Sequence, residues 1–100
     1  MAEGMVYRVI TANENIVVYG ALWCGDCWRA KKFLDERHIP YEWIDVDKDP
    51  EAAGYVQRIN KGMRSIPTII FPDGSVLVEP SHAELAKKFG LQAERWLLLE

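Results

Sequence analysis

Short apolar segments and amphipathic segments alternate along this chain, and their order limits the folds it can adopt. Residues 16–20 form an apolar run of strand length, and an amphipathic helix is predicted to follow over residues 25–37. Residues 41–46 alternate well enough for a second strand. A second helix is predicted to begin at Asp49 and Pro50, because aspartate caps helices and proline fits their first turn.

The second half of the chain predicts a hairpin and a last helix. Residues 68–71 and 76–78 read as strands on either side of a turn at residues 72–75. Ser81 and Glu84 have the spacing of a capping box, which marks the start of a helix. The order is therefore β-α-β-α-β-β-α, with the first two strands parallel and the last two antiparallel. This predicts an α/β fold in which helices flank a four-stranded mixed sheet.

Each of the first two predicted helices carries one apolar stripe that is expected to face the sheet. In the first helix the stripe consists of Cys27, Ala30 and Leu34, with Phe33 beside it. In the second helix it consists of Ala52, Tyr55, Val56 and Ile59.

Length and charge restrict the possible functions. The 100 residues suit one domain, expected to span residues 1–100 with its core at about 16–89, and residues 5–11 and 91–100 as extensions of unassigned role. The net charge is −3 without a basic run, so no nucleic-acid partner is expected. No apolar run approaches the roughly 20 residues of a membrane-spanning helix, and no signal peptide is evident. A cytoplasmic monomer without membrane contact is predicted.

Cys24 and Cys27 lie where the first strand passes into the first helix. Such a junction is the carboxyl end of a strand, where open α/β sheets place their sites. Free N–H groups and the dipole at a helix N-terminus favour a thiolate by roughly 0.3–1 kcal/mol, or up to about 2 when it is partly buried. Cys27 lies one turn further on the same face. We therefore expect Cys24 to be an exposed attacking thiol and Cys27 to resolve the mixed disulfide.

The residues beside Cys24 shape the predicted site. Gly25 suits a tight turn and leaves the thiol uncovered. Asp26 complements the helix dipole, but its charge opposes the thiolate. Trp23 is interpreted either as one wall of the site or as part of the core.

A second motif precedes the third predicted strand and comprises Arg64, Ser65, Ile66 and Pro67. A proline at the start of a strand is either an edge-strand residue or part of a cis-proline loop beside Cys24. In a cis-proline loop, the backbone of Ile66 could pair with an extended substrate. Arg64, together with Lys61, is either a positive rim for a substrate carboxylate or an ordinary solvated charge.

A zinc half-site is the alternative interpretation of two cysteines at this spacing. Zinc needs about four ligands, and His38 and His82 have no ligand spacing with the cysteines. Both histidines are interpreted as structural or exposed, and no metal is expected.

The cysteine motif, residues 44–47, the Arg64–Thr68 loop and the turn at residues 71–75 together resemble the glutaredoxin-like branch of the thioredoxin superfamily, and most of all mycoredoxin-type glutaredoxins. The resemblance implies a redox-active Cys24–Cys27 pair and a cis-proline at Pro67. The residues expected to bind substrate are Trp23, Gly25, Asp26, Arg64, Ser65, Ile66 and Pro67. No bound cofactor is implied; mycothiol or glutathione is the expected co-substrate.

Two differences from typical glutaredoxins argue against glutathione as the co-substrate. Ala21 stands where typical glutaredoxins carry a lysine, and Glu79-Pro80-Ser81 replaces their Gly-Gly-acidic segment.

The sequence thus leads to three hypotheses of function. The first is a thiol–disulfide oxidoreductase that reduces protein disulfides, or mixed disulfides with a low-molecular-weight thiol, as an electron carrier in redox homeostasis. The second is a redoxin that thioredoxin reductase supplies and that serves one protein such as ribonucleotide reductase. The third is a non-catalytic redox-sensing or cluster-bridging module.

Overall fold

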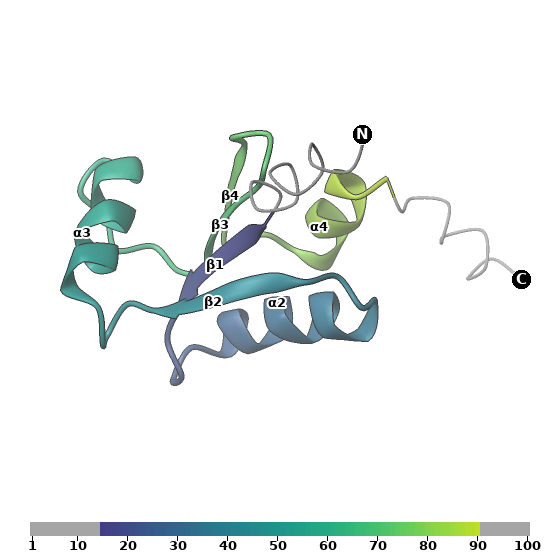
Figure 1. Ribbon diagram of the computed structural model, residues 1–100, viewed down its shortest axis with the longest axis horizontal. Coiled ribbons are helices and arrows are strands. Elements are labelled where there is room, and N and C mark those ends of the chain that lie inside the picture. The colour runs from purple at the N-terminus through teal and green to yellow at the C-terminus, as the bar shows by residue number, and fades with distance from the viewer. Residues whose placement is uncertain (1–14, 91–100) are drawn as a thin grey trace, which may run out of the picture.

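A computed structural model of the protein describes residues 15–90 (Figure 1). The extensions at residues 5–11 and 91–100 lie outside the described residues. The elements follow the predicted order, namely β1 (Ile16–Gly20), α2 (Gly25–Glu36), β2 (Tyr41–Asp45), α3 (Pro50–Ile59), β3 (Thr68–Ile70), β4 (Val76–Val78) and α4 (His82–Lys88). None of the described helices is long and apolar enough to cross a membrane.

The four strands form one mixed sheet in the order β2-β1-β3-β4. β1 runs parallel to β2, whereas β1 with β3 and β3 with β4 are antiparallel pairs. Val18, in the middle of β1, lies opposite Trp43 on one side and Ile69 on the other. The predicted α/β class and the β-α-β-α-β-β-α topology are therefore confirmed. Because β1 and β2 are parallel, the loops at their carboxyl ends emerge at the same edge of the sheet.

The helices begin where the sequence signals predicted. Asp49 caps α3, accepting the N–H of Ala52 at 3.1 Å, and Pro50 occupies the first turn. Both hydrogen bonds of the Ser81–Glu84 capping box are present at the start of α4, at 2.8 and 3.1 Å. These caps satisfy N–H groups that have no partner within the helix, so they define the two starts locally.

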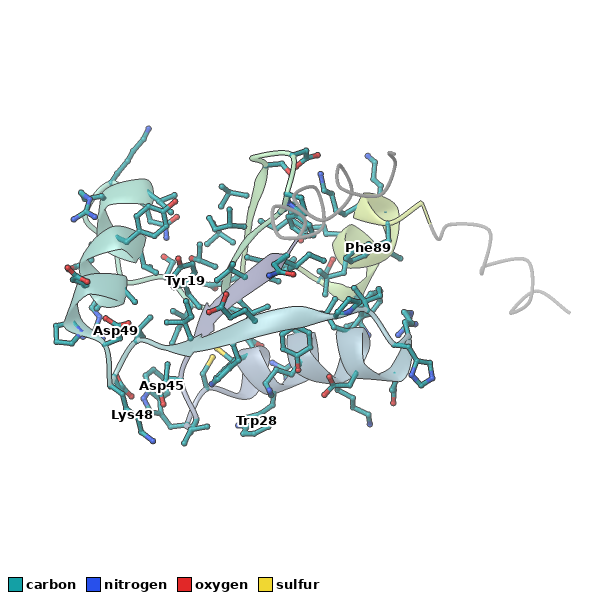
Figure 2. The ribbon with its side chains drawn as sticks, in the orientation of Figure 1. Tyr19, Trp28, Asp45, Lys48, Asp49 and Phe89 are labelled. Carbon is teal, nitrogen blue, oxygen red and sulfur yellow. The ribbon has the colours of Figure 1, made fainter. Side chains whose placement is uncertain are left out.

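Helices cover both faces of the sheet, and each face has its own core. On one face α2 and α4 pack against the strands, and the buried residues are Ile16, Val18, Ala30, Phe33, Leu34, Ile69, Phe71 and Leu85. Phe89 closes this core by packing on Phe71 at a ring distance of 5.7 Å (Figure 2). On the other face α3 buries Ala52 and Val56 against Val46 and Tyr19. Burying each large aliphatic side chain contributes about 1.5–3 kcal/mol.

Tyr55 is the one member of the predicted stripe of α3 that is exposed. Its ring packs on that of Tyr19, in β1, at a centroid distance of 5.6 Å. Tyr55 therefore contacts the sheet, as its spacing predicts, but it is not buried in the core.

Gly20, the last residue of β1, allows the strand to approach the cysteine helix closely. A Cβ at this position would lie 2.6 Å from Cη2 of Trp43 and 2.8 Å from Sγ of Cys27. Both distances are below van der Waals contact, and both neighbours are held in the core. The space that a side chain would need is thus already filled by the indole and the sulfur.

We expect Gly20→Ala to destabilise the protein by about 1–3 kcal/mol, because a methyl group would overfill this packing. Urea unfolding measures the loss. Gly54→Ala is the matched control: it lies inside α3, its Cβ would meet only Arg58 at 3.6 Å, and alanine favours helix by about 0.5–1 kcal/mol. Equal unfolding midpoints for wild type and Gly20→Ala would contradict the packing argument.

Candidate active site

Cys24 caps α2 with its sulfur. Its backbone is extended, with φ −90° and ψ 112°, and its Sγ accepts the N–H of Cys27 at 3.2 Å. Its own N–H donates to the carbonyl of Ala21 at 3.2 Å, which closes the turn after β1. Side-chain oxygens normally hold this position, where unpaired N–H groups and the helix dipole favour a negative charge. The sulfur of Cys24 therefore takes the place of the usual capping oxygen at the start of α2.

Cys24 is less exposed than predicted. Only 7% of the residue is accessible, because Ala21 and Ile66 pack around it. It is reached through a cavity of about 430 Å³, here called the Cys24 cavity, which is lined by Trp23, Cys24, Gly25, Asp26, Arg29, Arg64, Ile66 and Glu79. Cys27 is fully buried and is not part of this lining. A molecule that enters the cavity therefore meets Cys24 first.

Burial raises the pKa of the Cys27 thiol to about 12, and the hydrogen bond with Cys24 adds to the effect. Both cysteines are free thiols in this structure. Cys27 consequently keeps its proton at neutral pH.

The raised pKa of Cys27 predicts how stability changes at alkaline pH. An unfolded chain releases this proton near pH 9.0, whereas the folded protein retains it to about 12. The folded state binds more protons in this window, so the free energy of unfolding falls as pH rises, by up to about 1.4 kcal/mol per pH unit. Urea unfolding should show a shallower fall for Cys27→Ala. If the free energy of unfolding fell equally steeply with pH in both proteins, the fall would be due to groups other than Cys27.

The loop before β3 forms the wall opposite α2. The Ile66–Pro67 peptide bond is cis, as predicted, and Pro67 is buried. The carbonyl of Ile66 lies 3.9 Å from Sγ of Cys24. The hydroxyl of Thr68 donates to the carbonyl of Ser65 at 2.6 Å and accepts from Asn60 at 3.1 Å, which holds the loop in place. The backbone carbonyl of Ile66 therefore lies beside the thiol of Cys24.

Trp23 forms a wall of the Cys24 cavity and is not part of the core. Its side chain is 71% exposed, and its Nε1 donates to Oδ2 of Asp47 at 2.6 Å. Arg64 lies 3.6 Å from the other oxygen of the same carboxylate. Asp47 thus links two residues of the predicted site. The sequence reasoning missed Asp47, although its place just after β2, parallel to β1, could have indicated it.

The remaining predicted residues divide into two groups. Gly25 and Asp26 line the Cys24 cavity, and Asp26 forms an ion pair with Arg29 on α2. Ser65 and Pro67 do not line it.

Arg29 and Glu79 line the cavity but were not among the predicted residues. The position of Arg29, three residues after Asp26 on a helix, was a usable signal.

Lys61 and the histidines lie outside the Cys24 cavity. His82, however, lines a neighbouring cavity of about 340 Å³ that shares Asp26, Arg29 and Glu79 with it. His82 itself is exposed. Its ring also packs on Phe33 at 5.4 Å. Within residues 15–90, no group of three or more His, Cys, Asp or Glu could hold a metal ion.

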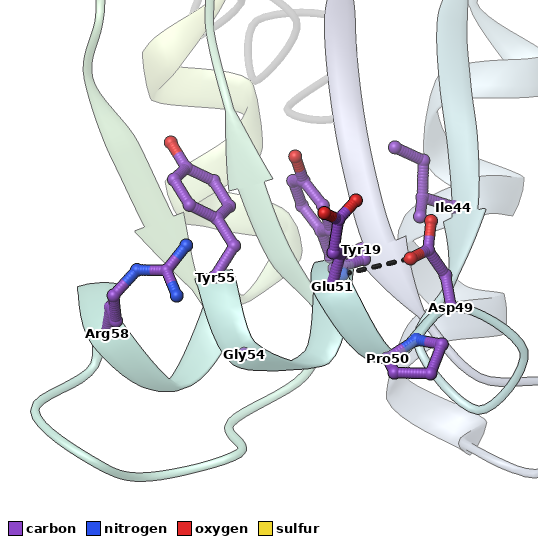
Figure 3. Close-up of a pocket in the computed structure, with 9 residues that line it drawn as sticks. Tyr19, Ile44, Asp49, Pro50, Glu51, Gly54, Tyr55 and Arg58 are labelled. Atoms are coloured by element: carbon purple, nitrogen blue, oxygen red, sulfur yellow. Dashed lines mark hydrogen bonds between the residues drawn. The ribbon is translucent and has the colours of Figure 1, made fainter.

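A further cavity of about 480 Å³ lies between β1 and α3 and contains no cysteine (Figure 3). Two of its polar side chains have structural partners: Asp49 caps α3, and Arg58 lies over the ring of Tyr55 at 5.8 Å. The Cys24 cavity therefore remains the candidate site.

Comparisons with known proteins agree with this geometry. A family model described as Glutaredoxin matches residues 16–77. Mycoredoxin 1 of Corynebacterium glutamicum is 38% identical over 75 residues, covering 75% of this chain and 92% of the relative. A protein named as a glutaredoxin in Mycobacterium tuberculosis is 38% identical over 73 residues, covering 73% and 87%. The glutaredoxin-like protein NrdH of Escherichia coli is 32% identical over 59 residues, covering 59% and 70%.

A solved structure supports the same fold. The crystal structure of a thioredoxin-like protein superposes with a TM-score of 0.64 at 30% identity, covering 73% of this chain and 97% of that one.

Proposed function

The chain belongs to the glutaredoxin family, and from this premise we propose that Cys24 and Cys27 are the catalytic dithiol of a thiol–disulfide oxidoreductase that reduces protein disulfides or mixed disulfides with a low-molecular-weight thiol. One observation carries the proposal: the Cys24 sulfur accepts a helix N–H at the wall of an open cavity, with Cys27 buried one turn behind it. Thiolate stabilisation, access and a second thiol are the three requirements of dithiol exchange.

In the first step the Cys24 thiolate attacks one sulfur of a substrate disulfide. A bond forms between Cys24 and that sulfur, the substrate disulfide breaks, and the departing thiolate takes up a proton. The cavity admits the substrate to Cys24, and the carbonyl of Ile66 lies beside the reacting sulfur. Trp23, Gly25, Asp26, Arg64 and Ile66 provide the surrounding contacts in this proposal, and Ser65 and Pro67 support the loop.

In the second step Cys27 loses its proton and attacks the Cys24 sulfur. A Cys24–Cys27 disulfide forms, the mixed disulfide breaks, and the second substrate thiol leaves, so that two electrons pass to the substrate. The hydrogen bond with Cys24 and the charge of Cys24 both raise the pKa of Cys27. Both are lost once Cys24 is part of a mixed disulfide, which makes the proton of Cys27 easier to remove at the step that requires it.

The source of electrons distinguishes two forms of the proposal. The similarity to mycoredoxin 1 supports a low-molecular-weight thiol, mycothiol or glutathione, as co-substrate. The similarity to NrdH supports the alternative of a redoxin supplied by thioredoxin reductase, acting on a dedicated protein such as ribonucleotide reductase. In either form we propose a single cytoplasmic domain over residues 1–100, active as a monomer.

Coupled assays separate these forms. The protein is given one disulfide substrate and, in parallel, mycothiol with its reductase, glutathione with its reductase, or thioredoxin reductase, and NADPH oxidation is followed. We expect turnover in a thiol-coupled assay. Turnover with thioredoxin reductase alone would support the alternative. No turnover in any assay, together with iron in a persistent dimer after anaerobic purification, would replace the proposal with a cluster-bridging module.

A further inference from the structure

The charged side chains around the Cys24 cavity are neutralised by partners, with one exception. Asp26 pairs with Arg29, and Arg64 pairs with Asp47. Glu79 is exposed and lines the same cavity, yet its carboxylate has no hydrogen bond or ion pair within residues 15–90. Among the charged side chains that line the cavity, Glu79 is therefore the one without a partner in the part of the chain that the structure describes.

The backbone holds Glu79 in an unusual conformation. Its φ is +50°, in the left-handed region that non-glycine residues seldom adopt. Its N–H donates to the carbonyl of Pro67 at 2.8 Å, which anchors it to the loop beside Cys24. Such strained positions are frequent at functional sites. The loop that positions Ile66 therefore also fixes the backbone of Glu79.

The location of Glu79 connects two cavities. It lines the Cys24 cavity and also the neighbouring cavity of about 340 Å³ towards α4. Glu84 also lines that second cavity, and it is engaged in the capping box of α4. Burial is the main cause of the raised pKa of Cys27, and the charge of Glu79 makes a small further contribution in the same direction. A substrate that extends from Cys24 towards α4 along these cavities therefore passes the residues that both share, which are Asp26, Arg29 and Glu79.

Building on the proposed function, we propose that Glu79 is a specificity-determining residue that favours disulfide substrates with a cationic side chain, lysine or arginine, close to the cysteine that reacts with Cys24. An ammonium or guanidinium group in this position pairs with the carboxylate of Glu79. A carboxylate there meets like charge, and the nearest cations, Arg29 and Arg64, already have acidic partners. Exposed pairs of this kind change affinity by about two- to fivefold per charge.

Three peptide disulfides test this inference. They share one sequence and differ only in the residue next to the cysteine, which is Lys, Gln or Glu, and kcat/KM is measured for each. We expect the wild-type protein to prefer the Lys peptide over the Gln peptide by about two- to fivefold, and the Gln peptide over the Glu peptide by a similar factor. Added salt should reduce both ratios, because the charge is exposed.

Variants then assign the preference to one side chain. Glu79→Gln should bring the three rates together, and Glu79→Lys should reverse their order. Glu51→Gln is the control, because Glu51 is exposed on α3 and lines only the cavity without cysteines, so the preference should persist. Ratios within one variant do not depend on how much of the protein is folded.

The outcomes are distinct. Equal rates for all three peptides in the wild-type protein, or a preference that survives in Glu79→Gln, would overturn the role of Glu79. Reduction of none of the peptides by the wild-type protein would instead refute the proposed oxidoreductase function.

Discussion

Replacing Cys24 by serine should reduce turnover of every disulfide substrate by at least about a thousandfold, to the rate of uncatalysed exchange. A serine hydroxyl is not ionised at neutral pH and cannot form the mixed disulfide. Serine is nevertheless a preferred helix cap, and the sulfur it replaces accepts the N–H of Cys27. Cys24→Ser should therefore keep the fold while removing the nucleophile.

The rate of reduction of a peptide disulfide measures this loss of activity, and urea unfolding shows whether the variant still folds. Cys24→Ala serves as a second variant: it lacks both nucleophile and cap, so it should be equally inactive and less stable by about 0.5–2 kcal/mol. If Cys24→Ser still reduces disulfides, the assignment of Cys24 as nucleophile is wrong.

Replacing Cys27 by serine should stop the reduction of protein disulfides but leave exchange with low-molecular-weight thiols. Cys24 can still attack, but no second thiol lies one turn away to release it. The mixed disulfide between Cys24 and the substrate should therefore accumulate, and mass spectrometry should detect it as a single adduct at Cys24. An added thiol should release the adduct slowly.

Two controls accompany this variant. Cys27 is fully buried, so Cys27→Ala tests whether the added hydroxyl of serine, rather than the missing thiol, causes the effect. The double variant lacking both cysteines should form no adduct. Wild-type rates of protein disulfide reduction by Cys27→Ser would rule out a resolving role for Cys27.

The parts of the fold that sequence reasoning predicted are those governed by local signals. The Asp49 cap and the Ser81–Glu84 box mark the starts of α3 and α4 because a side chain satisfies N–H groups two or three residues away. The cysteine pair was recognisable for the same reason, since residues three apart on a helix share a face. In the structure the sulfur of Cys24 accepts a hydrogen bond from the N–H of Cys27, three residues further along the chain.

Residues that depend on distant contacts were harder to predict. Trp23 could be read as core or as wall, because its hydrogen bond partner Asp47 lies 24 residues away across a parallel strand pair. The accessibility of Cys24 depends on Ile66, 42 residues away. Tyr55 has the spacing of a core residue but is exposed, although its ring contacts Tyr19.

The sequence alone determined the order of the elements, their caps and the pairing of two thiols at a helix start, since each follows from interactions among neighbours in the chain. Only the tertiary structure decided which side chains surround Cys24. The packing of the sheet brings the ends of β1, β2 and β4 and the Pro67 loop together, and this packing places Asp47 and Glu79 at the site. Contacts between segments far apart in the chain depend on register and packing, which no local pattern specifies.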